Sequence, residues 1–136
     1  MLQFYFLSIV SNLIAGAALA SDAFTRRIPS LAALAGSLAG RRGKLFSGLA
    51  SLLVGVGTLF VPAAGGTIVV GDLFPSVVGM VMGIALLFEV FKQDAMFPAD
   101  RADKGERASI GYRTTLGLLG IAAAVLHFFL PDRLIL

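Results

Sequence analysis

Residues 73–91 have the sequence LFPSVVGMVMGIALLFEVF, which contains a single charged residue, Glu89, close to its end. A helix of this length spans about 28 Å, nearly the thickness of the hydrocarbon core of a bilayer. Because lipid offers no hydrogen-bond partner to the backbone, a helix is the only open-chain structure that satisfies such a segment inside a membrane. The stretch therefore predicts a transmembrane helix.

Three further stretches are similarly apolar. Residues 2–24 contain one charge, Asp22, residues 45–61 contain none, and residues 114–130 contain only His127 as an ionisable side chain. Only 14% of the 136 residues are charged and 57% are hydrophobic, whereas a soluble domain carries roughly 25% charged residues. We therefore predict an all-α integral membrane protein with four transmembrane helices.

The first of these stretches also has one feature of a cleavable signal peptide. Its Ala18-Leu19-Ala20 resembles the small-residue site that signal peptidase cuts. However, the beginning of the chain carries no basic residue, and the apolar stretch is longer than the core of an ordinary signal peptide. We expect this span to be retained.

Basic residues gather in two of the three connections between the spans. Residues 26–44 hold five basic residues and no acid, and residues 92–113 hold five basic and four acidic residues. The positive-inside rule assigns such loops to the cytoplasm. We therefore expect a bacterial-type inner-membrane protein with loops 25–44 and 92–113 cytoplasmic and both termini outside. The net charge of +3 then reflects orientation, and no nucleic-acid partner is expected.

The two halves of the chain resemble each other. Residues 16–24 match residues 83–91 at an offset of 67, with a glycine, an acid and a phenylalanine in common register. Further matches at an offset of 69 are Pro29 with Pro98, Lys44 with Arg113, Gly48 with Gly117, and Pro62 with Pro131. We therefore predict one domain, residues 1–136, made of two tandem repeats, 1–66 and 67–136. Because each repeat has two spans, the repeats run parallel and are related by a pseudo-twofold axis along the membrane normal.

Residues 28–40 are apolar but too short to cross a bilayer. Two interpretations remain open. The segment is either a short helix in the cytoplasmic interface, held by apolar contacts and anionic headgroups, or a loop packed against the bundle whose arginines only set the topology. In the first case the candidate lipid contacts are Arg26, Arg27, Arg41, Arg42 and Lys44.

Asp22 and Glu89 occupy matching positions near the cytoplasmic ends of spans one and three. At that depth the cost of a charge is much smaller than at the membrane centre. We expect interfacial ion pairs, and the alternative is handling of protons or cations. The expected pairs are Asp22 with Arg26 or Lys44, and Glu89 with Lys92 or Arg113.

Small and polar residues recur every four positions in spans one and three. Ser8, Asn12 and Gly16 align with Pro75, Gly79 and Gly83. Small residues allow helix backbones to approach closely, and such packing drives association in lipid. We expect spans one and three to meet along the pseudo-axis, with Asn12 bonding across helices or, alternatively, binding a substrate. By the same argument, we expect small residues to pack spans two and four, namely Ser51, Gly55, Gly120 and Ala124.

Catalytic chemistry has little support in the sequence. The chain has no cysteine and one histidine, which leaves no thiolate chemistry and no histidine-based zinc site. No nucleophile and base stand in a recognisable arrangement. We expect no enzymatic activity, catalytic residue, metal or cofactor, and we interpret His127 as a tolerated interfacial residue, with pH sensing as the alternative.

Three hypotheses about function remain. The first is a non-catalytic membrane protein that acts through helix contacts, as a homo-oligomer or as a subunit of a larger membrane complex. The second is a small oligomeric transporter or channel for an ion or small solute, since parallel repeats are common among transporters. The third is a protein that binds anionic membrane lipid through its basic interfacial segment.

Overall fold

The computed structural model describes residues 2–60, 73–94 and 102–129, and every element in that part of the chain is helical. Three of the prolines used in the repeat alignment, Pro62, Pro98 and Pro131, lie outside the described residues. The elements are α1 (Leu2–Leu19), α2 (Ser21–Arg27), the 3-10 helix η1 (Pro29–Leu31), α3 (Ala32–Ala39), α4 (Arg41–Phe60), α5 (Leu73–Asp94) and α6 (Ala102–Phe129).

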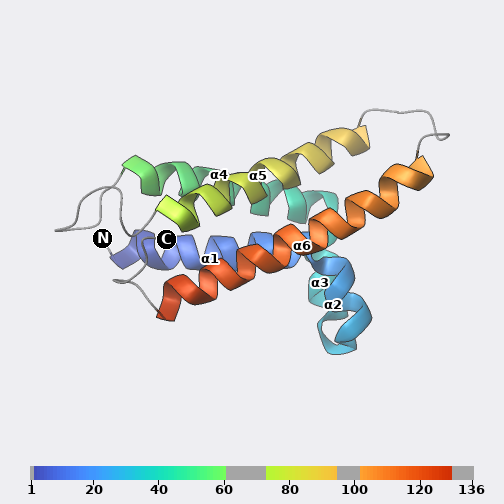
Figure 1. Cartoon of the computed structure of the whole chain (residues 1–136), viewed down its shortest axis with the longest axis horizontal. Coiled ribbons are helices and arrows are strands. Elements are labelled where there is room, and N and C mark those ends of the chain that lie inside the picture. Colours follow the sequence, from blue (N-terminus) through green and yellow to red (C-terminus); the bar gives the residue numbers. More distant parts are fainter. Residues whose placement is uncertain (1, 61–72, 95–101, 130–136) are drawn as a thin grey trace.

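Four long helices, α1, α4, α5 and α6, form an antiparallel bundle (Figure 1). α1 begins and α6 ends at one end of the bundle, whereas α4 begins and α5 ends at the other, from which α2 and α3 project sideways (Figure 1). Three segments are long and apolar enough to cross a membrane: Arg41–Phe60, Leu73–Lys92 and Ile110–Phe129. α1 and α2 together would make a fourth, bent span.

The first expected span, residues 2–24, is not one straight helix. α1 ends at Leu19, and α2 departs from its direction by 71°. α2 has the sequence SDAFTRR, and the matching residues of α5, FEVFKQD, contain as many charged residues but continue the helix, so polarity alone does not explain the bend. The bend moves Asp22 away from the end of a transmembrane helix and into a lateral one.

Residues 28–40 are helical, in η1 and α3. α3 contacts both α1 and α4, so it is a short helix that also packs against the bundle. α6 begins at Ala102, twelve residues before the expected boundary at 114, because hydropathy alone does not detect a polar extension of a helix.

α1 and α5 are the central pair of the bundle. α1 contacts α4, α5 and α6, and α5 contacts α4 and α6, whereas α4 and α6 do not touch within the described residues. The buried apolar cluster lies between the central helices and consists of Ala15, Ala18, Leu19, Met82 and Leu86. The expected meeting of spans one and three thus corresponds to α1 against α5.

Gly16 and Gly83, however, lie in the interfaces with the outer helices, α6 and α4. A Cβ added to Gly16 would lie 2.7 Å from the carbonyl oxygen of Gly117 in α6, and one added to Gly83 would lie 2.7 Å from that of Gly48 in α4. We expected Gly16 and Gly83 to join spans one and three, and this prediction was wrong. They bring α1 against α6 and α5 against α4 because each glycine faces an outer helix of the bundle.

Ser51 and Gly55 also contact the central helix α5, since a Cβ on Gly55 would lie 2.8 Å from the carbonyl oxygen of Ser76 and Ser51 donates a hydrogen bond to Gly79. On α6, Gly120 lies against Met82 of α5. Ser51 and Gly55 therefore pack α4 against α5, and Gly120 packs α6 against α5, whereas Gly117 packs α6 against α1.

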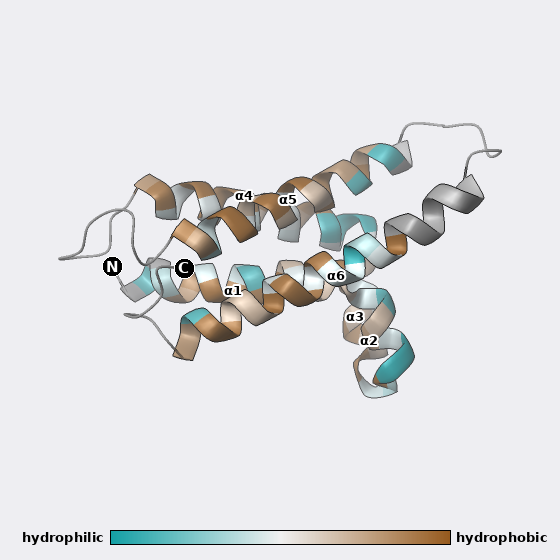
Figure 2. Ribbon diagram, viewed as in Figure 1, coloured by the Kyte–Doolittle hydropathy of each residue, from teal (hydrophilic) through white to brown (hydrophobic). Residues whose placement is uncertain are grey.

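The bundle is partly inverted relative to a soluble protein, since polar as well as apolar side chains are buried in it. Its buried polar residues include Ser8, Asn12, Ser51 and Thr58. Large apolar side chains face outward on every long helix, and phenylalanines 46, 60 and 129 are 72%, 79% and 72% exposed. Hydrophobic residues cover much of the long helices, and hydrophilic ones stand out in α2, at the beginning of α4 and near the end of α5 (Figure 2).

Candidate functional site

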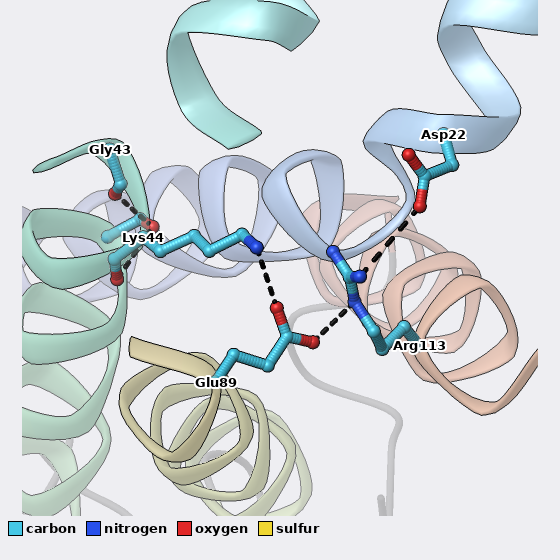
Figure 3. A network of polar contacts seen from close by, with 6 residues as sticks. Asp22, Gly43, Lys44, Glu89 and Arg113 are labelled. Atoms are coloured by element: carbon cyan, nitrogen blue, oxygen red, sulfur yellow. Dashed lines mark hydrogen bonds and ion pairs between the residues drawn. The ribbon is translucent and has the colours of Figure 1, made fainter. Parts of the chain in front are cut away.

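Four charged side chains from four different helices meet at the end of the bundle from which α2 and α3 project. Asp22 comes from α2, Lys44 from the first turns of α4, Glu89 from the last turns of α5, and Arg113 from the middle of α6. Figure 3 shows Glu89 between the two cations, with Asp22 on the far side of Arg113. We call these four residues the charged cluster.

Glu89 is the centre of the charged cluster. Its Oε2 lies 2.9 Å from Nζ of Lys44, and its Oε1 contacts Nε of Arg113. Arg113 also reaches Asp22, with 3.9 Å between Nη1 and Oδ2. The side chains of Lys44, Glu89 and Arg113 are 6%, 15% and 17% exposed, whereas Asp22 is 42% exposed.

The structure pairs these residues differently from the sequence-based expectation. Among the described ion pairs, Glu89 holds Lys44 as well as the expected Arg113, and Asp22 meets Arg113 instead of Arg26 or Lys44. Two features of the fold explain the difference. α4 packs against α5, which brings Lys44 to Glu89, and the bend after Leu19 places α2 next to α6.

The charged cluster has formally balanced charges, with two acids and two bases. A buried carboxylate is tolerated when cations compensate it, and each partner becomes costly when the other is removed. Because both oxygens of Glu89 face cations, the arrangement favours a structural ion-pair network over a site that binds a free cation. Within the described residues, no group of three metal-ligating side chains lies close enough to hold a metal ion.

Lys44 was also a candidate lipid contact, and the structure does not support that role. Its side chain is buried and bound to Glu89, so it is not available to a headgroup. The other four candidates are exposed on α2 and at the beginning of α4, namely Arg26, Arg27, Arg41 and Arg42.

Asn12 lies in the centre of the helix interface. It is almost fully buried, and its Nδ2 donates a hydrogen bond to the carbonyl oxygen of Pro75 in α5, at 3.0 Å. Its Oδ1 would lie 2.6 Å from a Cβ added to Gly79. The absence of a side chain at Gly79 therefore makes room for the amide. Ser8, one turn earlier, is also buried and accepts a hydrogen bond from Ser11 at its carbonyl oxygen.

Sequence reasoning missed another polar contact between helices. The hydroxyl oxygens of Thr58 in α4 and Ser76 in α5 are 2.6 Å apart and both side chains are buried. Thr58 aligns with His127 in the other repeat, and this match of two polar residues was the available signal.

His127 is not an exposed interfacial residue. It is buried beside Tyr5 of α1, with their ring centroids 4.8 Å apart, and the Tyr5 hydroxyl donates to its carbonyl oxygen at 2.8 Å. α1 covers this face of α6, so His127 packs between two helices, and its place at the membrane interface stays a prediction.

Comparison with known proteins gives one finding. A protein-family model to which no function is attached matches residues 1–127, almost the whole chain. No curated protein and no solved structure matches the chain.

Proposed function

The chain belongs to this family of unknown function, and we propose that it is a four-span membrane protein that works without catalysis, through helix contacts. In this proposal α1 with α2, α4, α5 and α6 are the spans, and two parallel two-helix repeats build the bundle. The protein acts as a homo-oligomer or as a subunit of a larger complex of a bacterial-type inner membrane, with both termini outside.

The inverted distribution of side chains carries the proposal. Serine, threonine and asparagine side chains share the interior with the apolar cluster, whereas large apolar side chains of all four long helices are exposed. In water this surface would be a strong aggregation hazard. In lipid it is the expected arrangement, because small and polar residues hold the helices together there while large apolar residues face the acyl chains.

Contacts between matching positions support the repeat. The alignment pairs Gly16 with Gly83 and Gly48 with Gly117, and the close approaches run from Gly16 to Gly117 and from Gly83 to Gly48. The same contact is therefore made twice, once on each side of the bundle, as a twofold axis requires.

Two matching residues also touch each other. Asn12 aligns with Gly79 at the offset of 67, and its amide lies against that glycine. Residues that an axis exchanges can touch only where the axis passes between them. The proposed pseudo-twofold axis therefore runs between the centres of α1 and α5.

The packing favours helix contacts over transport through one copy. Backbones approach closely at Gly16 and Gly83, and the one central amide, Asn12, already bonds to Pro75. A solute pathway would thus have to run between copies of the chain. The exposed faces of α4 and α6, including Leu53 and Leu119, are where a second copy or a partner would bind.

Single-cysteine labelling tests the orientation, since the natural sequence has no cysteine. We expect an impermeant maleimide to label Gly66→Cys in intact spheroplasts and to label Asp103→Cys only after lysis. Labelling of both positions from the same side would refute the four-span arrangement.

Cysteine crosslinking in native membranes tests the helix contacts. We expect Leu53→Cys or Leu119→Cys to give one constant adduct, and the buried control Ala124→Cys to give none. If no lipid-facing position can be crosslinked to a neighbour, the proposed mode of action fails.

A further inference from the structure

A groove of about 440 Å³ lies between α5 and α6 on the outside of the bundle, next to the charged cluster. We call it the α5–α6 groove. Its apolar wall consists of Val81, Ile84, Ala85 and Phe88, and its polar end consists of Glu89, Lys92, Tyr112 and Arg113. Its volume is within the range of small-molecule sites. Sequence reasoning did not find it.

The matching place in the first repeat is covered by the chain itself. By the repeat alignment, Ala85 corresponds to Ala18 and Arg113 to Lys44. In the first repeat α3 contacts both α1 and α4, and its Leu38 packs against the buried cluster that contains Ala18. Ala18 is fully buried, whereas Ala85 is partly exposed.

The counterpart of α3 in the second repeat has a different composition. Residues 98–109 are mainly polar, with six charged residues, whereas residues 28–40 have none. Such a segment is a poor filler for an apolar groove, because desolvating its charges has a high cost. In the proposed membrane setting, the surrounding lipid is then the most abundant apolar material available to this groove.

The polar end of the groove is cationic. Within the described side chains Lys92 forms no ion pair, and its Nζ lies 5.0 Å from the centroid of the Phe88 ring. The two acids and two bases of the charged cluster balance one another, so among the described side chains that line the groove Lys92 adds one further positive charge. Tyr112 is exposed beside it and carries a hydroxyl donor.

We propose that the α5–α6 groove binds one anionic phospholipid. An acyl chain lies along Val81, Ile84 and Phe88, and the phosphate lies between Lys92 and the Tyr112 hydroxyl. Along the helix axis the apolar wall of the groove comes first and the cation follows. This is the order of acyl chain and phosphate in a phospholipid. Basic pockets between transmembrane helices on the cytoplasmic side bind anionic headgroups in this way. The inference rests on the proposed four-span architecture.

Native mass spectrometry of the full chain, released from nanodiscs of phosphatidylglycerol and phosphatidylcholine, tests the site. We expect the wild type to retain one phosphatidylglycerol and Lys92→Gln to bind it about fivefold more weakly, which is the effect of roughly one cationic contact near a membrane surface. The matched control is Arg42→Gln, which removes the same charge from an exposed position outside the groove; we expect it to keep the one retained phosphatidylglycerol, because the attraction of this arginine acts on the surrounding lipids as a group. Equal losses in both variants would mean general surface attraction and would overturn the site.

A phosphatidylglycerol with a photoreactive acyl chain locates the lipid. We expect adducts on the peptide that contains residues 81–88, fewer of them in the groove-filling variant Ala85→Leu, and no change in Ala122→Leu, a control on an exposed part of α6. Adducts spread evenly over the helices would overturn the proposal. A photoreactive residue at position 85 provides the converse test. If it crosslinks to another protein and not to lipid, a partner helix occupies the groove and the proposal is overturned.

The two proposals fail in distinguishable ways. Carbonate extraction and cysteine labelling of the same preparations report whether the chain is inserted with the proposed topology. A correctly inserted protein that binds phosphatidylglycerol equally well with and without Lys92 refutes the lipid site alone, whereas a chain that is not inserted refutes the architecture.

Discussion

Replacement of Glu89 by glutamine is expected to destabilise the bundle more than any other single change in the charged cluster. Glu89 is the only acid that contacts Lys44 within the described residues, and it also holds Arg113. The side chains of the two cations are 6% and 17% exposed, so Glu89→Gln leaves them poorly solvated and, for Lys44, without a counterion. Breaking a buried pair from one side costs about 3–5 kcal/mol, and we expect a loss of unfolding free energy in this range.

Substitutions at the other members of the charged cluster are expected to cause smaller losses of unfolding free energy, with which the loss in Glu89→Gln can be compared. Lys44→Met removes one cation, but Glu89 keeps Arg113, so we expect the smaller loss of about 1.5–3 kcal/mol that follows from one hydrogen bond to a charged group. Asp22→Asn is expected to cost less than about 1 kcal/mol, because Asp22 is 42% exposed and 3.9 Å from Arg113, and solvent screens such a pair. The double variant Lys44→Met/Glu89→Gln should recover about 1–3 kcal/mol relative to the sum of the single losses, because the unpaired ammonium is gone.

Steric trapping in bicelles measures these unfolding free energies without removing the protein from a lipid environment. The expected order of destabilisation is Glu89→Gln, then Lys44→Met, then Asp22→Asn. A broken buried pair lowers the unfolding free energy by about 3 kcal/mol or more. If Glu89→Gln lowers it by less than about 1 kcal/mol, a buried network centred on Glu89 is refuted. Strict additivity of the Lys44 and Glu89 variants would refute their contact.

Three further predictions concern the packing and the surface of the bundle. Gly16→Ala should lower the unfolding free energy by about 1–3 kcal/mol through overpacking, because the new Cβ would lie 2.7 Å from the Gly117 carbonyl oxygen, whereas Gly111→Ala, with nothing within 4 Å, should be neutral or slightly stabilising; similar losses would contradict the close approach. Asn12→Leu should cost about 0.6–1.7 kcal/mol, the measured range for hydrogen bonds between helices in a membrane, and should leave liposome permeability unchanged, since a change in flux would point to a pathway at the membrane centre. Neutralising the four exposed arginines should weaken the enrichment of phosphatidylglycerol around the inserted protein in mixed-lipid nanodiscs by about 1 kcal/mol per residue at low salt; enrichment equal to that of the wild type would exclude them as lipid contacts. These arginines are Arg26, Arg27, Arg41 and Arg42.

The sequence was sufficient to predict the long helices but not all of their ends. Residues 45–61 and 73–91 fall almost entirely within α4 and α5, because an uninterrupted apolar run has few other ways to satisfy its backbone. The bend after Leu19 has no proline or glycine to announce it. The extension of α6 to Ala102 is equally invisible to a search for apolar runs, since its polar residues are compatible with a helix.

Small-residue patterns predicted which helix faces are buried, but not the helix that each face contacts. Asn12 and Gly79 do meet across α1 and α5, as the alignment of the two spans indicated. Gly16 and Gly83 lie one turn further along the same helices and contact α6 and α4 instead. Two helices that cross at an angle separate within a turn or two, and the angle depends on ridges and grooves along both helices. A one-dimensional pattern does not contain this information.

The same limitation explains the ion pairs. The sequence indicated four interfacial charges at matching positions of two repeats, and a symmetric pairing within each repeat was the simplest expectation. The bend after Leu19 breaks that symmetry, because it carries Asp22 sideways while Glu89 stays inside the bundle. Glu89 consequently takes both buried cations, and Asp22 keeps only a distant contact with one of them.

In the proposed repeat, the difference between the two halves is the most informative feature for function. An exact duplication would have placed an apolar helix over both outer grooves, as α3 covers the one between α1 and α4. Instead, residues 98–109 contain six charged residues, and the α5–α6 groove lies beside an exposed lysine, with no described helix over it. Packing alone does not favour the lack of an apolar covering helix, since filling an apolar groove stabilises a bundle in either repeat. The open groove is therefore the place on this bundle where binding of a molecule from the membrane is most consistent with the structure.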